Sequence, residues 1–166
     1  ENSRALQELI DDMFDTMHNS EGVGLAAPQV GELKRLFVMD ADPMAEEAGE
    51  PTYGPMVLIN PAIVSKEGEE VEMDEGCLSI PGVNAAVNRP ETIGVEYLDC
   101  DFKPRSLTAG GWQARVIQHE IDHLDGVLFL DHLSFFKRKL LSSKLQGIAS
   151  GETEIDYPVV SKKVKA

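Results

Sequence analysis

Two histidines and one glutamate are the residues of this sequence best suited to chemistry. His119 and His123 are four residues apart, and Glu120 directly follows the first histidine. Residues 111–124 are predicted to form one helix, because their apolar residues recur at helical spacing: Ala114, Ile117, Ile121 and Leu124. Both imidazoles would then face one metal ion, and Glu120 could reach a water on that ion. The pattern is typical of metal-assisted hydrolases, and the simpler alternative is an amphipathic helix with two ordinary histidines.

A metal site needs a third ligand, and two groups of zinc peptidases take theirs from the chain after the helix. One group uses a downstream glutamate, where this sequence has Ser142 and Ser143. The other uses a further histidine, at a position that Phe129 occupies here. Both peptidase interpretations therefore lack a ligand.

Cys77 is the candidate third ligand. It lies between Gly76 and the extended run Leu78-Ser79-Ile80, in a turn-rich stretch where a thiolate could approach a metal ion. One cysteine and two histidines leave a fourth coordination position open, which is typical of catalytic rather than structural zinc sites. Cys100 follows a predicted strand and is interpreted as a small buried thiol.

A third stretch, residues 22–31, combines glycines with small apolar residues. It does not fit a dinucleotide-binding loop, because no strand precedes it and Pro28 would interrupt a following helix. Glycines beside alanines instead indicate that the backbone passes close to a ligand or to another segment.

Taken together, the three stretches resemble the peptide deformylase family. The family's motifs G-x-G-x-A-A-x-Q, E-G-C-L-S and Q-H-E-x-D-H occur unbroken and in order at residues 22–29, 75–79 and 118–123. The similarity covers nearly the whole chain, including Asp125-Gly126 and a helical segment after Ser134. It implies a hydrolase that removes the formyl group from the N-terminal formylmethionine of newly made polypeptides and releases formate.

The resemblance also implies which residues bind the metal ion. Cys77, His119 and His123 would hold one divalent ion, which in this family is iron(II). Ligand softness alone also admits zinc, nickel or cobalt.

The resemblance further implies catalytic and substrate-binding groups. Glu120 would act first as base and then as acid, while the Gln29 side-chain amide and the Leu78 backbone N–H would stabilise the oxyanion. The peptide backbone would pair as an added strand and the methionine side chain would fill an apolar slot. The residues expected to contact the peptide are Val23, Gly24, Trp112 and Val116.

Three further expectations concern the surroundings of this site. Glu75 and Arg89 would form an ion pair that braces the cysteine loop. Asn84 replaces an arginine that many relatives carry near the substrate entrance, so a charge contact with the peptide would be missing. A strand and loop that precede the first helix in relatives are not found in this sequence.

The composition points to one domain, residues 1–150, followed by a polar tail at residues 151–166. No apolar run reaches the roughly 20 residues that cross a bilayer, and no secretory signal is present. The net charge of −14 argues against a general nucleic-acid binder and against DNA as a partner. Two cysteines in unrelated surroundings fit a reducing cytoplasm better than a disulfide framework.

The charge is unevenly distributed along the chain. Residues 1–133 carry 8 Lys+Arg and 26 Asp+Glu, a net of −18, whereas residues 134–166 carry 7 and 3, a net of +4. The positive charges cluster at residues 137–139 and at Lys162, Lys163 and Lys165. A solvated helix face is the usual explanation. The sharper hypothesis is that this basic C-terminal helix contacts the ribosome, as the resemblance implies.

The remaining pattern predicts an α+β fold, in which antiparallel strands surround the metal-binding helix and further helices lie near both ends. The first helix is expected at residues 3–17, and the acidic segment 40–55 is expected to be a surface loop. Ile155, Tyr157 and Val159 alternate in the tail and could pack on the body. The expected strands are 33–39, 56–64, 71–73, 92–98 and 105–108.

Two non-hydrolase classes remain open at this point. A metal-retaining but inactive binding module would be signalled by loss of Glu120 or Gln29, and both residues are present. A purely structural zinc site would need a fourth protein ligand, and none of the motifs supplies one.

Overall fold

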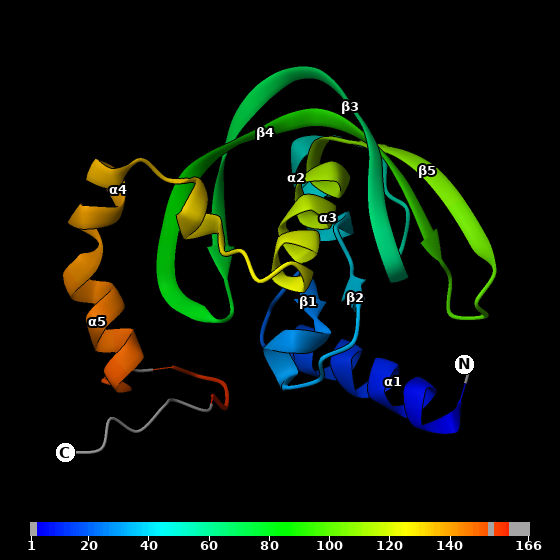
Figure 1. The fold of residues 1–166 in the computed structure, drawn as a ribbon, viewed down its shortest axis with the longest axis horizontal. Coiled ribbons are helices and arrows are strands. Elements are labelled where there is room, and N and C mark those ends of the chain that lie inside the picture. The colour runs from blue at the N-terminus through cyan, green and yellow to red at the C-terminus, as the bar shows by residue number, and fades with distance from the viewer. Residues whose placement is uncertain (1–2, 153–154, 160–166) are drawn as a thin grey trace.

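The computed structural model describes residues 3–152 and 155–159, and its largest element is one antiparallel sheet. The strand order is β1-β2-β3-β4-β5, so every strand pairs with its neighbour in sequence. The strands are β1 (Gly24–Ala26), β2 (Leu36–Met39), β3 (Met56–Cys77), β4 (Ile80–Leu98) and β5 (Pro104–Gly110). The sheet is strongly curved, and helix α3 (Gly111–Leu124) lies inside the curve (Figure 1). The predicted α+β class with antiparallel strands is confirmed.

The long pair β3–β4 corrects the predicted strand pattern. Segments 56–64 and 71–73 are not separate strands, because both belong to β3, which continues to Cys77. Register shifts let this hairpin bend without ending its strands, and one of them lies beside Gly68, whose φ is +78°. The glycine therefore marks a bulge where the sequence suggested a turn.

The ends of the shorter strands also differ from the prediction. β2 begins at Leu36 rather than at residue 33, and Leu33 is 94% exposed. β5 is longer than predicted, because it pairs with β4 along its whole length, from Pro104 to Gly110.

Helix α2 (Asp42–Ala48) lies in a segment predicted to be a surface loop. Pro43 stands in its first turn, where a proline's fixed φ suits a helix, and Gly49 ends it in the left-handed conformation with φ +71°. Ala45 is buried, so this short helix packs against the rest of the protein and is not a solvent-exposed loop.

Two predicted helices are confirmed. Helix α1 (Arg4–Asn19) begins after Ser3, whose side chain accepts a hydrogen bond from the backbone N–H of Leu6 at 3.2 Å. One face of α1 is buried, through Ile10, Met13 and Met17. Helix α3 has the predicted bounds and packs against β1, β2, β4 and β5.

Three apolar clusters hold these elements together. The largest joins α3 to the sheet through residues such as Phe37, Leu58, Val95 and Ile117. The second lies under α1, and the third joins the β3–β4 hairpin to the C-terminal helices. The two histidines of α3 are therefore fixed to the sheet by the largest of these clusters.

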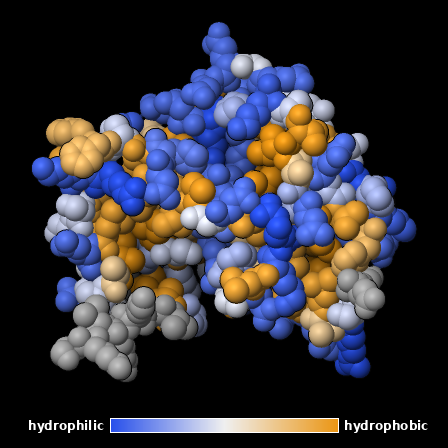
Figure 2. All heavy atoms as spheres, in the orientation of Figure 1, coloured by the Kyte–Doolittle hydropathy of each residue, from blue (hydrophilic) through white to orange (hydrophobic). Residues whose placement is uncertain are grey.

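The C-terminal part of the described chain contains η2 (Phe129–His132), α4 (Phe135–Leu140) and α5 (Ser142–Ser150). Leu141, Leu145 and Ile148 pack against the third cluster, which confirms the helical segment predicted after Ser134. On α4, apolar side chains (orange at the left of Figure 2) lie beside basic ones (blue). The basic residues Lys162, Lys163 and Lys165 lie outside the described residues.

Within the described part of the chain, no helix is long and apolar enough to span a membrane.

Candidate active site

The three motif stretches meet at one cavity of about 610 Å³. The residues proposed from the sequence that border it are Val23, Gly24, Gln29, Cys77, Leu78, Trp112, Val116, His119 and Glu120. His123 lies next to the cavity, with its side chain buried beside Cys77. Segments far apart in sequence thus converge as predicted.

The candidate metal ligands are close enough to hold one ion. Sγ of Cys77 and one ring nitrogen each of His119 and His123 all lie within 4.8 Å of one another. Sγ of Cys77 is 3.2 Å from Nε2 of His123. Cys77 is the last residue of β3, whereas the two histidines are one helical turn apart on α3. One thiolate and two imidazoles form a donor set suited to a divalent transition metal.

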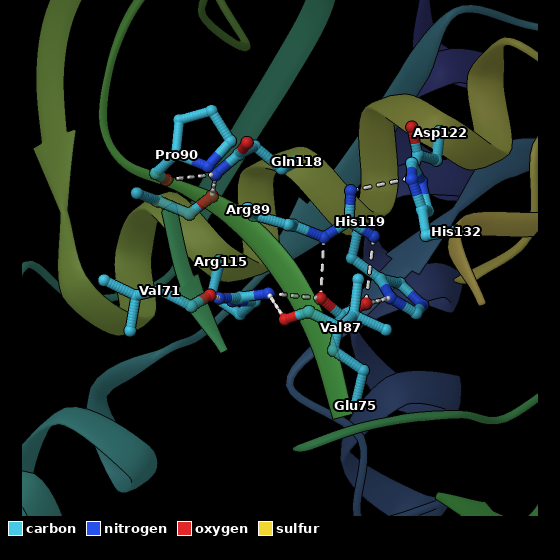
Figure 3. Close-up of polar contacts among 11 residues, drawn as sticks. Val71, Glu75, Val87, Arg89, Pro90, Arg115, Gln118, His119, Asp122 and His132 are labelled. Atoms are coloured by element: carbon cyan, nitrogen blue, oxygen red, sulfur yellow. Dashed lines mark hydrogen bonds and ion pairs between the residues drawn. The ribbon is translucent and has the colours of Figure 1, made fainter. Parts of the chain in front are cut away.

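The Glu75 carboxylate orients His119 through the ring nitrogen Nδ1. Its Oε2 lies 2.9 Å from Nδ1 of His119, which leaves Nε2 of that ring for a metal ion. Figure 3 shows the same carboxylate receiving hydrogen bonds from Arg89 and from Arg115. Glu75 and Arg89 are 5% and 4% exposed, so the predicted ion pair is a buried one.

The ion-pair network continues beyond Glu75. Arg89 also donates to Oδ2 of Asp122 at 2.8 Å, and the same oxygen lies 2.7 Å from Nε2 of His132. Arg115 donates to the backbone oxygens of Val87 and Val71 at 2.9 and 2.6 Å. The buried charged groups next to the candidate metal site therefore form ion pairs and hydrogen bonds with one another, which offsets the cost of burying them.

This network changes the acidity of the ligands. Burial alone would raise the pKa of Glu75, but hydrogen bonds from Arg89 and His119 hold it well below its usual range. Burial would also raise the pKa of the Cys77 thiol, yet hydrogen bonds and charges from His119 and His123 lower it to about 6. Burial would lower the pKa of His119, but its contacts with Cys77 and Glu75 raise it to about 10. Cys77 is therefore readily available as a thiolate.

Glu120 differs from Glu75 because no arginine pairs with it, and the charges of His119 and His123 offset the effect of its burial only in part. Its side chain points into the cavity region but is only 3% exposed, and burial raises its pKa to about 7. Among the described residues, its Oε2 is the one buried side-chain oxygen or nitrogen without a hydrogen-bond partner. Such an atom is typical of a group that gains its partner from substrate, water or metal.

Gln29 is oriented so that its NH₂ group faces the cysteine. Its Oε1 accepts a hydrogen bond from the backbone N–H of Ala26 at 2.8 Å, which fixes the orientation of the amide. Its Nε2 lies 3.6 Å from Sγ of Cys77 and 3.0 Å from Oγ of Ser79. The side chain thus presents a donor to the cavity, as an oxyanion site needs.

The expected peptide-binding residues lie around the same space. Val116 is 4% exposed and contributes to the main core as well as to the cavity wall, while Trp112 is half-buried. Asn84, the departure noted in the sequence, also borders the cavity. Cys100, in contrast, is exposed, and its interpretation as a buried thiol is wrong.

Four residues of the site were not identified from the sequence. Arg115, Asp122 and His132 belong to the ion-pair network, and Tyr157 borders the cavity. Arg115 and Asp122 carry local signals, because Arg115 lies four residues before His119 on the same helix face and Asp122 stands in the third family motif, residues 118–123. The others depend on contacts between distant segments.

Comparison with known proteins agrees with this geometry. The family model described as polypeptide deformylase matches residues 1–139. The peptide deformylase of Salinibacter ruber is 57% identical over 166 residues, covering 98% of this chain and 85% of that protein. The peptide deformylase of Chlorobaculum tepidum is 46% identical over 155 residues, covering 93% and 81%.

Solved structures show the same relationship. The crystal structure of the Ehrlichia chaffeensis peptide deformylase in complex with actinonin is 44% identical, with a TM-score of 0.81, and the match covers 93% of this chain and 87% of that one. The peptide deformylase of Legionella pneumophila is also 44% identical, with a TM-score of 0.78 and coverage of 92% and 85%. The chain therefore belongs to the polypeptide deformylase family, the metal-dependent hydrolases that remove the formyl group from the N-terminal formylmethionine of newly made polypeptides.

Proposed function

We propose that the deformylase reaction takes place in the cavity between β1, the end of β3 and α3, with Cys77, His119 and His123 as metal ligands and Glu120 as the acid–base group. The observation that carries this assignment is the position of Glu120. Its unpartnered Oε2 is buried next to three clustered ligand atoms. In this proposal α3 is the metal-binding helix around which the antiparallel strands are organised, within a catalytic unit of residues 1–150.

A divalent ion at this site would supply a water whose pKa is lowered towards neutrality and a positive charge for the developing oxyanion. The residues fit such an ion, because the thiol and the imidazoles can all serve as deprotonated ligands. Glu75 would fix the tautomer of His119 by taking its Nδ1–H, at the observed 2.9 Å.

Glu120 would transfer the protons of the reaction. Its carboxylate accepts a proton from the water that attacks the formyl carbon, and the carboxyl group then gives that proton to the leaving amine. Burial raises its pKa to about 7, which brings its acid and base forms close in energy near neutral pH. One side chain can therefore serve in both steps.

Gln29 and Leu78 would stabilise the negative oxygen that forms on the formyl carbon. Gln29 presents its NH₂ group beside Cys77, and Leu78 directly follows that cysteine, so its backbone N–H lies at the same end of β3. Loss of one such donor typically lowers the rate by about 10²–10³.

The peptide backbone would extend the sheet beside Gly24. β1 is an edge strand of the described sheet, since it pairs with β2 alone, and Gly24 borders the cavity. A peptide can add to such an edge through backbone hydrogen bonds. Val23, Trp112 and Val116 would then surround the methionine side chain.

Iron(II) is proposed as the natural metal ion. The mixed sulfur and nitrogen ligands accept iron, zinc, nickel and cobalt, so the donor set alone does not choose among them. Cys77 borders an open cavity, which makes oxidation of its thiolate a liability for a ferrous site. Metal analysis after purification without oxygen tests the assignment, and zinc as the sole retained metal with full activity would refute it.

We also propose that the protein works in the cytoplasm and contacts the ribosome through α4. Lys137, Arg138 and Lys139 are exposed basic residues of this helix, next to the exposed Phe135 and Phe136. A basic surface on an otherwise acidic chain suits ribosomal RNA beside the emerging polypeptide. A thiolate ligand also suits a reducing compartment.

The decisive experiment for the residue roles compares two variants. Glu120→Ala should retain one metal ion per chain and lose turnover, because the ligands stay in place while the proton acceptor is removed. Cys77→Ala should lose both metal and turnover. Formate release by the metal-loaded Glu120 variant at the unaltered rate would contradict the acid–base role.

A further inference from the structure

Tyr157 is part of the cavity wall although it comes from a segment that follows the last helix. It lies beyond residues 1–139, the part of the chain that the family model matches. The motif residues account for metal binding and proton transfer without it. The role of this side chain must therefore be derived from its own contacts.

The hydroxyl of Tyr157 donates a hydrogen bond to the backbone oxygen of Leu78 at 2.8 Å. Leu78 and Ser79 form the tight connection between Cys77 and Ile80, which face each other across the β3–β4 hairpin. The contact thus reaches the two residues that link the cysteine ligand to the rest of β4. A hydrogen bond at this point restrains the backbone of the turn itself.

The other side of Leu78 is also restrained. A Cβ atom on Gly22 would lie 2.8 Å from Cδ1 of Leu78, so this side chain packs directly on the first motif. With its side chain packed against the Gly22 backbone and its carbonyl bonded to Tyr157, Leu78 is held from two directions. Both contacts restrain the residue that carries the N–H group beside Cys77.

Helix α5 anchors the segment that carries Tyr157. Leu145 and Ile148 pack on the apolar cluster that also contacts Cys77, and Nζ of Lys144 donates to the backbone oxygen of Gly82. Gly151, at φ +78°, ends the helix in the left-handed conformation. Figure 1 shows the following residues (red) beside the end of α5, on the side that faces the body.

The hydroxyl of Tyr157 remains a donor at neutral pH. Burial and the negative charge of Cys77 both raise the pKa of the phenol above its usual value. The carbonyl of Leu78 offers no proton, so the tyrosine must supply the one in this bond.

We propose that Tyr157 is a positioning residue of the deformylase reaction, which holds Leu78 through its hydroxyl and closes the substrate cavity with its ring. The inference rests on the proposed role of the Leu78 N–H in stabilising the oxyanion. Residues 151–166 are then more than a polar tail, because at least one of them completes the site.

Removal of the hydroxyl alone tests the positioning role. Tyr157→Phe should lower kcat for a formyl-Met-Ala-Ser peptide about fivefold, the effect of one neutral hydrogen bond, and change KM by less than about twofold. Tyr53→Phe is the matched control, because Tyr53 is 59% exposed and does not border the cavity. An unchanged kcat, or a fall in kcat fully explained by lost metal, would overturn the proposal.

A binding measurement tests the ring independently of turnover. Trp112 is the sole tryptophan of the chain and borders the same cavity, so its fluorescence reports occupancy. The unformylated product Met-Ala-Ser should bind metal-loaded Tyr157→Ala at least about threefold more weakly than the unaltered protein. An equal Kd overturns the proposal. Absence of formate release by the unaltered protein would instead refute the proposed function, and the Kd comparison would still decide whether the Tyr157 ring contributes to the cavity.

Discussion

A Cβ atom on Gly24 would lie 2.3 Å from Oε1 of Glu120, so any larger residue at this position of β1 would require the carboxylate on α3 to shift. This contact joins the first family motif to the third. It explains physically why a glycine stands at this position, since φ of Gly24 is not in the left-handed region. The clash, rather than backbone freedom, requires the glycine.

Gly24→Ala should therefore displace Glu120. Glu120 is 3% exposed and borders the cavity, so the carboxylate would have to move away from the Cβ atom and out of its present position. We expect kcat to fall by about 10²-fold, because small misplacements of a catalytic group are costly. Metal content should stay unchanged. Gly147→Ala is the matched control, since nothing lies within 4 Å of the added atom there. Full activity in the Gly24 variant would contradict the assigned position of Glu120.

Metal binding should weaken as the pH falls. The pKa of Cys77 is lowered to about 6 and that of His119 is raised to about 10. Metal binding displaces the protons of the ligands, so Zn²⁺ competes with the proton of His119 between pH 10 and 6 and with more than one proton below pH 6. Between pH 10 and 6, the apparent Kd for Zn²⁺ should rise about tenfold for each unit by which the pH falls. Below pH 6, it should rise more steeply. A competing chelator calibrated at each pH measures this, and a Kd independent of pH would rule the ligand set out.

Arg115 should matter for stability although it touches no ligand. It donates to Glu75 and to the backbone oxygens of Val87 and Val71, with 4% of its surface exposed. Arg115→Ala leaves these buried acceptors with fewer partners, which should lower the free energy of unfolding by about 3–5 kcal/mol. Urea unfolding with saturating metal measures the loss.

Arg4→Ala is the control for this variant, because the Arg4 side chain is 92% exposed in its pair with Glu8. Its unfolding transition should coincide with that of the unaltered protein. Equal transitions for the Arg115 and Arg4 variants would show that the buried network contributes nothing to folding.

Ribosome contact through α4 predicts a charge-dependent interaction. Replacement of Lys137, Arg138 and Lys139 by glutamine should reduce co-sedimentation with ribosomes, most strongly at low salt. A triple variant of three exposed lysines elsewhere, Lys34, Lys66 and Lys103, should bind as the unaltered protein does. Equal binding by both triple variants would refute this use of α4.

The sequence was sufficient to predict α3 and the residues around it. Helical spacing of apolar residues is a local signal, and it placed the bounds of α3 correctly at Gly111 and Leu124. The spacing of His119 and His123 then put both imidazoles on one face, and the structure brings Cys77 to them. Where a pattern depends on neighbours along the chain, the sequence is informative.

Other features depend on contacts across the fold. The sequence does not show that β3 is one continuous strand, because Gly68 resembles a turn residue. In the structure, β4 pairs with β3 on both sides of this glycine. The burial of Glu75 also follows from packing, since only the folded sheet brings Arg89 and Arg115 to it. His132 gave no local signal, and the alternation of Ile155, Tyr157 and Val159 suggested packing on the body but no place for Tyr157 in the site. These residues act through partners that are distant in sequence.

Formate release from formyl-Met-Ala-Ser tests the central claim most directly. The protein should be purified without oxygen, loaded with metal and compared on the matching acetyl-Met-Ala-Ser peptide. We expect formate from the first peptide and no cleavage of the second. No formate from folded, metal-loaded protein would contradict it.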